Sequence, residues 1–490
     1  MYAMKGLPDR DEFWGWQQQL AERGPRFTGN AAHREFVDKL QAHLENIGLT
    51  VHRDELHFRR WEATRWELRL HGIKSDEEIL PVAYYYPYSG ETSPQGVTGE
   101  LVHCGGALGN YSQAAGKIAV VEASILPFPT LLLRRRSGTL PFVLINPTLG
   151  SILNPPDLTT AARAGVLGVI CVWRNCSADN AAYQALPFLQ PYQGCPGLWV
   201  DGKTGDKLIA QAKKGARATL VLEAEVTENA PTHTLWAELP GQNPNETVIV
   251  NTHTDGPNLC EENGGLALLA LARSFAAKPV SERQRSLLFV FISGHFRIPE
   301  LAVDPERQAT STWLAQHSDL WDGKEGHRHA VAGVTLEHLG AMEWSDDKAR
   351  SRYAPTGRPD YELIYTGNEE MERIYQSASR LQTVRRPVTL RPAYDLYLGE
   401  GAALYHKGMP TISLVPGPTY LCAARPDGNI GKVDATLAHQ QLQTFARVLE
   451  EIDRTPTEQI GTAQRQAFGL LGLVLGLVLR IVRSLHPKPS

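Results

Sequence analysis

The sequence has 490 residues, of which 42% are hydrophobic and 21% are charged, and its formal net charge is −4. This balance is typical of a globular protein and argues against a disordered chain. A chain of this length is expected to form two or three domains. The weakly negative charge gives no reason to expect a nucleic-acid partner.

The six cysteines are few for this length and show no Cys-x-x-Cys spacing, so we do not expect a zinc knuckle. Residues 1–16 contain no apolar stretch of signal-peptide length. We therefore predict a cytoplasmic location with reduced thiols.

A helix is predicted after Asn30, whose side chain can cap its first turn. Apolar residues recur along it at spacings of three and four, at Phe36, Val37, Leu40, Leu44 and Ile47. Gly48 is placed to end this helix, and a strand is predicted over residues 49–56.

Residues 85–225 are richer in glycine and proline, and short strands are predicted within them at 116–121 and 166–173. A further strand is expected near 234–239, and a last helix, capped by Asp434, carries an apolar stripe. Strands that alternate with helical segments predict an α/β three-layer sandwich around a mostly parallel, mixed sheet.

The most informative stretch begins with the apolar run 247–252, which ends in His253-Thr254-Asp255. An acidic turn with two glycines follows at 261–265, and then a predicted helix and a second apolar strand, at 266–275 and 286–293. A His at the end of a buried strand can ligate a metal, and we expect the Asp255 carboxylate to hold its other ring nitrogen.

This order resembles the co-catalytic zinc aminopeptidases, peptidase family M twenty-eight, which also includes glutamate carboxypeptidase-like and glutaminyl cyclase-like members. The resemblance continues through the segments VTLEHLG at 334–340, GMPTISL at 408–414 and KVD at 432–434. It covers roughly residues 226–455 and implies the zinc aminopeptidase-like fold.

The resemblance also implies a division of the chain into four parts. Residues 1–84 resemble the opening of the family's catalytic domain, and residues 226–455 resemble its main part. Between them, 85–225 resembles an inserted, β-rich protease-associated domain, and an apolar C-terminal tail occupies 456–490.

In this family two metal ions share one carboxylate. At the positions of the first site the resemblance places His253, Glu261 and Glu337, with Asp255 as the residue that orients His253. The bridging carboxylate falls on Cys260, Glu261 or Glu262, depending on a one-residue gap.

At the second site the resemblance places Phe296 and either Tyr420 or Leu421, and neither a benzene ring nor an alkyl chain can ligate zinc. We therefore expect a single zinc ion or none. His338 and His406 are histidines that could replace the lost ligands.

His295 aligns with the family's general base, and an imidazole suits proton transfer near neutral pH. Glu262 is the second catalytic candidate. The competing interpretations are a strand-end His295 bonded to a carbonyl and an ordinary buried pair of His253 with Asp255.

The first functional hypothesis is an enzyme that acts on an amide bond of a peptide-like or N-acyl small molecule, by hydrolysis, amide formation or cyclisation. The second is a non-catalytic pseudopeptidase that serves as a binding or scaffold protein. A third has Cys260 as nucleophile and His295 as its base.

The tail contains the uninterrupted apolar run 468–479, which is shorter than the roughly 20 residues of a membrane span. Gly472 and Gly476 have the spacing of a helix-packing motif. We weigh two roles equally for residues 468–482, a membrane-surface anchor and a helix that forms a homodimer or docks into a groove.

Overall fold

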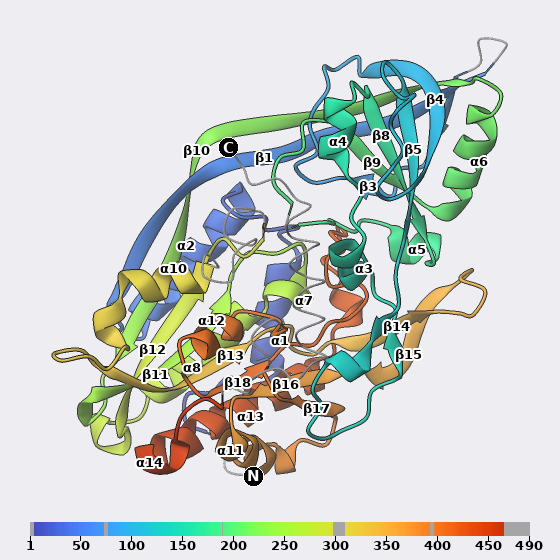
Figure 1. Ribbon diagram of the computed structural model, residues 1–490. Coiled ribbons are helices and arrows are strands. Elements are labelled where there is room, and N and C mark those ends of the chain that lie inside the picture. The colour runs from blue at the N-terminus through green and yellow to red at the C-terminus, as the bar shows by residue number, and fades with distance from the viewer. Residues whose placement is uncertain (1–3, 73–76, 189, 297–308, 393–395, 465–490) are drawn as a thin grey trace.

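The computed structural model describes residues 4–72, 77–188, 190–296, 309–392 and 396–464. A larger and a smaller part are joined by the long antiparallel strands β1 (Val51–His71) and β10 (Arg217–Leu239) (Figure 1). In the described ranges, one sheet of 14 strands runs through both parts, in the order β17-β16-β18-β13-β11-β12-β10-β4-β5-β8-β9-β3, with β1 on β10 and β2 (Glu77–Leu80) on β1.

The strands of the larger part are β11 (Asn243–His253), β12 (Arg285–Ile292), β13 (His329–Leu336), β16 (Glu362–Thr366), β17 (Pro387–Leu390) and β18 (Thr411–Leu414). The central strands β12, β11, β13 and β18 are parallel, while β16 runs antiparallel to β18 and β10 antiparallel to β12. A mostly parallel, mixed sheet is therefore confirmed.

Helices cover both faces of this sheet, as Figure 1 shows. One face packs in the main apolar core against α1 (Arg10–Ala21), α2 (Ala31–Asn46), α8 (Gly264–Ala276), α11 (Glu369–Ala378) and α13 (Ala435–Arg454). The other face packs against α10 (Ala309–Gln316) and α12 (Gly401–His406). These three layers confirm the predicted α/β sandwich.

The caps predicted from sequence form: Asn30 accepts from the backbone N–H of His33, and Asp434 from that of Leu437. Gly264 permits a close approach between the start of α8 and the ends of strands β11 and β13. A Cβ there would collide with the Leu336 carbonyl and the Thr252 side chain, so glycine lets α8 begin directly against β11 and β13.

The smaller part contains β3 (Tyr84–Tyr85), β4 (Val97–Gly106), β5 (Ile118–Ser124), β8 (Gly168–Arg174) and β9 (Gly197–Val200), with α4 (Leu158–Arg163), α5 (Ala178–Ala181) and α6 (Gly202–Ala212). Strands β4, β5, β8 and β9 are parallel, and helices lie between β5 and β8 and between β8 and β9 along the chain. This arrangement differs from a purely β-rich insert. Its assignment as a protease-associated domain, and the division at 84, 225 and 455, stay predictions.

The segment 126–152 runs from the smaller part across the larger one, and we call it the strap. It contains β6 (Phe128–Pro129), β7 (Val143–Leu144) and most of α3 (Pro147–Leu153). The remaining elements are α7 (Leu259–Glu262), α14 (Thr457–Ile460), β14 (Met342–Asp346), β15 (Tyr353–Pro359), and the 3-10 turns η1 (Thr130–Leu132), η2 (Val280–Glu282), η3 (Ser318–Leu320), η4 (Ser379–Leu381) and η5 (Ile430–Lys432).

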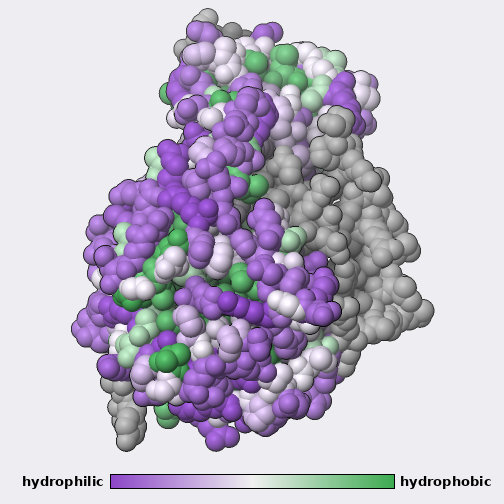
Figure 2. All heavy atoms as spheres, turned by 90° about the vertical axis from the view of Figure 1, so that its left-hand side faces the viewer, coloured by the Kyte–Doolittle hydropathy of each residue, from purple (hydrophilic) through white to green (hydrophobic). Residues whose placement is uncertain are grey.

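The strand predicted at 49–56 is much longer than expected, since β1 continues to His71. Strand prediction depends on the alternation of apolar and polar residues. This alternation is missing in β1 and in its partner β10 because both strands carry many charged residues. Cross-strand ion pairs such as Arg65–Glu223 and Arg59–Glu228 replace apolar pairs along this ribbon. Figure 2 views the molecule from the left-hand side of Figure 1. It shows hydrophilic side chains over the narrow section between the larger and the smaller part.

None of the helices in the described ranges reaches the length and apolarity that a membrane crossing needs. The segment 468–482, to which we gave a membrane-surface, dimerisation or groove-docking role, lies outside the described residues.

The first residues of the predicted tail pack on the larger part. Ile460 is buried in its core, and the Asn368 side chain donates to the carbonyls of Ile460 and Thr462. Arg285, which is also buried, donates to the carbonyl of Thr455 and the hydroxyl of Thr457. Residues 456–464 therefore belong to the fold of the larger part.

A chain that ends after Thr455 should be less stable than the full chain by at least about 2 kcal/mol, because it exposes the pocket of Ile460 and leaves Asn368 without its partners. A chain that ends after Gln464 keeps these contacts and should unfold like the full chain. Thermal and urea unfolding of both truncations test this. Equal stability of the two would show that residues 456–464 contribute nothing.

Candidate functional site

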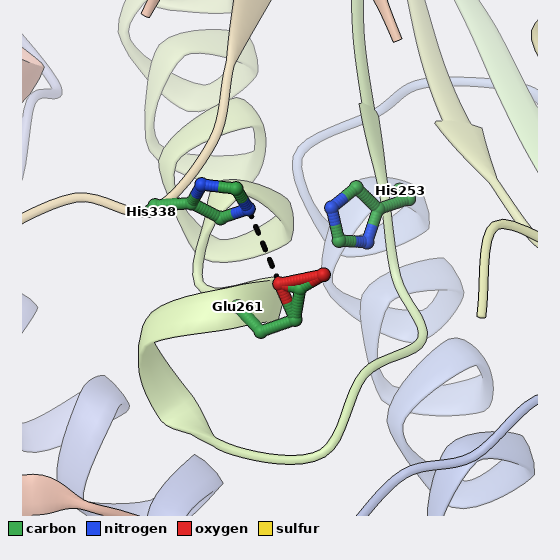
Figure 3. A group of neighbouring side chains, drawn as sticks. All are labelled: His253, Glu261 and His338. Carbon is green, nitrogen blue, oxygen red and sulfur yellow. Dashed lines mark ion pairs between the residues drawn. The ribbon is translucent and has the colours of Figure 1, made fainter. Parts of the chain in front are cut away.

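Three buried side chains converge where parallel strands end. His253 is the last residue of β11, Glu261 lies in α7, and His338 follows β13. One potential ligand atom from each residue lies within 4.8 Å of the others. Figure 3 shows the Glu261 carboxylate below and between the two imidazole rings. We call these residues the ligand cluster.

Main-chain carbonyls orient both imidazoles. Nδ1 of His253 lies 2.9 Å from the carbonyl oxygen of Asp255, and Nδ1 of His338 lies 2.5 Å from that of Pro416. Each Nδ1 can only donate to a carbonyl, so a neutral ring keeps its lone pair on Nε2, which faces the cluster. Burial, and then the charges of His295 and His338, hold the pKa of His253 well below its usual range, so this ring is neutral.

The ligand atoms do not satisfy one another. Nε2 of His338 lies 3.2 Å from Oε2 of Glu261, yet neither atom makes a hydrogen bond of acceptable geometry, and neither does Nε2 of His253. Buried polar atoms without partners are costly. Two imidazole nitrogens and a carboxylate are a suitable donor set for zinc with one position left open, so these residues fit a single zinc ion.

Glu337 is not part of this cluster, although the resemblance placed it there. Its Oε1 accepts from the backbone N–H of Glu400 at 2.7 Å. The adjacent His338 offers the third potential ligand atom of the cluster. Its φ of 58° is in the left-handed region, so the backbone turns sharply after β13 and neighbouring side chains no longer follow strand alternation. Burial raises the pKa of Glu337 to about 7.

Asp255 is important to the site, but not in the predicted way. Its main-chain carbonyl, not its carboxylate, contacts His253. The carboxylate accepts from the backbone N–H groups of Gly294, at 3.1 Å, and Phe296, at 2.9 Å, and from the hydroxyl of Thr28. It therefore fixes the loop after β12 beside the end of β11.

This loop places His295 against the ligand cluster. The ring of His295 stacks on that of His253 at 4.2 Å between centroids, and its Nε2 lies 4.0 Å from Oε1 of Glu261. Its Nδ1 lies 2.5 Å from Oε1 of Glu400. His295 is thus held by a carboxylate, not by a neighbouring carbonyl.

Burial alone would lower the pKa of His295, but the hydrogen bond to Glu400 and the charges of Glu400, Glu261 and Glu337 raise it to about 10. Burial works against ionisation of Glu400 as well, and the bond to His295 outweighs it, so the pKa of Glu400 is lowered. The two residues therefore form an ion pair in the absence of a bound cation.

Glu400 is a site residue that sequence reasoning missed. Its second oxygen accepts from the hydroxyl of Thr310, and its backbone N–H is the donor to Glu337. The signal for it is the sequence Gly399-Glu400-Gly401, an acidic residue between glycines directly before a short apolar helix.

Glu262 does not have the catalytic position that we expected. It forms an ion pair with Arg26, and both side chains are fully buried. Arg26 also donates to the carbonyl of Leu20 at 2.8 Å. Glu262 is not among the residues that line the cavity described below, so we assign it to this internal ion pair.

Cys260 is also removed from the chemistry, which leaves Glu261 as the acid of the cluster. Its thiol is fully buried, and burial together with the charge of Glu261 raises the pKa of Cys260 well above its usual range. Cys260 does not line the cavity either. A thiol without access to substrate cannot serve as the nucleophile.

Apolar side chains occupy the region where the family's second site would be. Phe296 stacks between Phe188, at 4.6 Å, and Phe27, at 5.7 Å, measured between ring centroids. The hydroxyl of Tyr420 donates to main-chain carbonyls, and Leu421 lines the cavity. That these positions hold no second ion stays a prediction.

A cavity of about 640 Å³ opens onto the site, a size in the usual range for small-molecule pockets. Glu261, His295, Glu337, His338 and Glu400 line its polar end. Much of the rest of its wall is apolar and comes from the strap.

No protein-family model matches the sequence. A probable leucine aminopeptidase 2 from Aspergillus oryzae is 23% identical over 271 residues, which cover 54% of this chain and 48% of that protein. The chain thus aligns with about half the length of this curated relative.

Three solved structures resemble the whole architecture. A zinc aminopeptidase from Bacillus subtilis superposes with a TM-score of 0.62 at 15% identity, covering 94% of this chain and 98% of that one. A peptidase M28 precursor from Shewanella amazonensis SB2B gives 0.63 at 14%, covering 91% and 98%. An aminopeptidase from Aneurinibacillus sp. strain AM-1 gives 0.58 at 16%, covering 91% and 95%. The chain has the zinc aminopeptidase-like fold.

We expect at most one tightly bound zinc ion per chain, measured by elemental analysis after dialysis. His338→Ala should lose it, with a fall in affinity larger than the about 10- to 100-fold that an outer-shell partner is worth. Glu337→Gln, the matched control, should keep it, because a glutamine oxygen still accepts from Glu400. Two equivalents in the unmodified chain, or the opposite response of the two variants, would contradict the assignment.

Glu262→Gln should lower the free energy of unfolding by about 3 kcal/mol, since it leaves the buried Arg26 without its counter-charge. Zinc content should not change. Glu228→Gln, which breaks an exposed pair with Arg59, should cost no more than about 1 kcal/mol. Urea unfolding of both variants provides the comparison, and a stable Glu262→Gln protein that has lost zinc would make Glu262 a ligand after all.

Proposed function

We propose that this chain is an enzyme that hydrolyses an amide bond of a peptide-like or N-acyl small molecule, with one zinc ion held by His253, Glu261 and His338. The observation that carries the proposal is the convergence of one ligand atom each from His253, Glu261 and His338 beside the His295–Glu400 pair, at the wall of the cavity. The fold shared with zinc aminopeptidases supports it.

Zinc bound by these residues would supply Lewis-acid polarisation of a carbonyl and activation of water. The side chains of the chain itself supply the proton transfer. Glu400 fixes the ring of His295 through Nδ1, so Nε2 is the atom that exchanges a proton with the reacting group. Glu261 lies between the two imidazoles of His295 and His338 and limits their movement.

Amide formation or cyclisation uses the same groups in the same cavity and differs in whether water or a second amine attacks. Mass spectrometry of the products distinguishes them: hydrolysis in water labelled with oxygen-18 places the label in the released carboxylate, whereas cyclisation does not.

A non-catalytic binding protein is the second candidate. The observation in its favour is the stack of Phe296 between Phe27 and Phe188, which replaces ligands by apolar surface. A binding role does not explain why the buried ligand atoms of His253, Glu261 and His338 converge. A zinc-loaded protein that turns over no aminoacyl amide, N-acyl amino acid or dipeptide would favour it.

His295→Ala should lower kcat by about 10² to 10⁴, the usual contribution of a positioned acid-base group, with little change in zinc content. The matched control is His439→Ala in α13, whose Nε2 lies 3.0 Å from the carbonyl oxygen of Pro8 and which does not line the cavity. It should keep near-normal turnover. If His295→Ala does so too, the proton transfer lies elsewhere in the cavity.

A further inference from the structure

The strap is fixed to the larger part at two points along its length. The backbone N–H of Arg136 donates to the carbonyl of Thr389 at 2.7 Å, and its guanidinium pairs with Glu372 at 3.2 Å. Further along, Asn146 donates to the carbonyl of Gly417 at 2.9 Å. The strap therefore packs firmly on the larger part, although the polypeptide enters it from the smaller part.

This wall exposes apolar side chains where a surface normally avoids them. Of the eleven large hydrophobic residues that are exposed in the described ranges, six lie in the strap. They are Leu126, Leu131, Phe142, Val143, Ile145 and Ile152. Single exposed apolar residues need no explanation, but such a concentration marks a binding surface.

The exposed surface is continuous with the catalytic cavity. Val143, Ile145 and Ile152, which are 38%, 45% and 37% exposed, line the same 640 Å³ cavity as His295 and Glu261. A ligand whose polar group reaches His295 can therefore lie along the strap without leaving this space.

The charged side chains of the cavity wall do not favour an anionic group near the bond to be cleaved. The carboxylates that line the cavity are Glu261, Glu337, Glu343, Asp360 and Glu400, and the basic residues are His295, His338 and Arg358. With two protonated imidazoles and a zinc ion of charge +2 these charges balance, so the wall carries no net positive charge that would attract an anion.

From this geometry we propose that the substrate is an amphipathic amide, whose amide reaches His295 and whose long, unbranched apolar chain lies along the strap against Val143, Ile145 and Ile152. The cleavage of this amide rests on the proposed function, whereas the binding of its apolar chain does not depend on it. Burial of each further methylene is worth up to about 0.8 kcal/mol, which corresponds to a gain of up to about fourfold in affinity.

Glycine N-alkylamides from butyl to decyl are suitable probes, because each carries an ammonium group, one amide and an alkyl chain of known length. Their affinities for the zinc-loaded full chain are measured by calorimetry below the concentration at which they aggregate, and alkylamine release is followed in parallel by mass spectrometry. We expect affinity to rise by about two- to fourfold per methylene up to a limit set by the cavity.

The double variant Ile145→Ser with Ile152→Ser should reduce this gain to less than about 1.5-fold per methylene. Both side chains are partly exposed, so the fold should tolerate the change. The matched control is Ile79→Ser with Leu381→Ser, which removes two exposed apolar side chains that do not line the cavity. Its chain-length dependence should equal that of the unmodified protein.

An affinity independent of chain length, or one that the strap variant leaves unchanged, would overturn the proposal. So would a strap variant that loses only its binding to phosphatidylcholine vesicles, because the strap would then be a membrane-docking surface. Chain-length-dependent binding without alkylamine release would sustain the apolar site and reject hydrolysis of these amides, so the two failures are distinguishable.

Discussion

A fully buried carboxylate, that of Asp255, connects the segments on which the site depends. It accepts from the backbone after β12 and from Thr28 in the N-terminal segment, while its own main chain continues β11 and orients His253. Burial raises the pKa of Asp255 to about 6, and these donors and the charge of His295 partly offset that effect. Without them the loop after β12 would lose its anchor, and His295 would not face the cluster.

The same logic extends to three other buried carboxylates, each of which faces a basic side chain. Glu262 faces Arg26, Glu400 faces His295, and Glu261 lies near two imidazoles. Removing charges from water is costly unless they are paired, so a site with this many ionisable groups is stable only as a set. The ion pairs also differ in their roles. The pair of Arg26 with Glu262 supports the segment of α7, while the pair of His295 with Glu400 faces the cavity.

The parts of the structure that depend on local patterns could be predicted from sequence. Capped helices and the apolar strand before His253 follow from periodicity and spacing, whereas the resemblance to the zinc aminopeptidases points to His253, Glu261 and His295 as site residues. His338 and Glu400 could not be assigned in this way, because their positions depend on a left-handed residue and on a helix start distant in sequence. For Glu262, sequence shows an acid next to the cluster but not which way its side chain points, and only the packing of Arg26 decides that.

The long ribbon of β1 and β10 has a consequence for how such a chain can change. The chain leaves the larger part along β1 and returns beside it along β10, with Phe58 directly opposite Ala230. A short hairpin turn at that point would close the backbone and omit the smaller part together with its strap, while the ligand cluster and the His295 pair would remain. With the roles proposed above, substrate preference and bond cleavage belong to separable stretches of the gene, and exchange of one stretch can redirect the enzyme without rebuilding its chemistry.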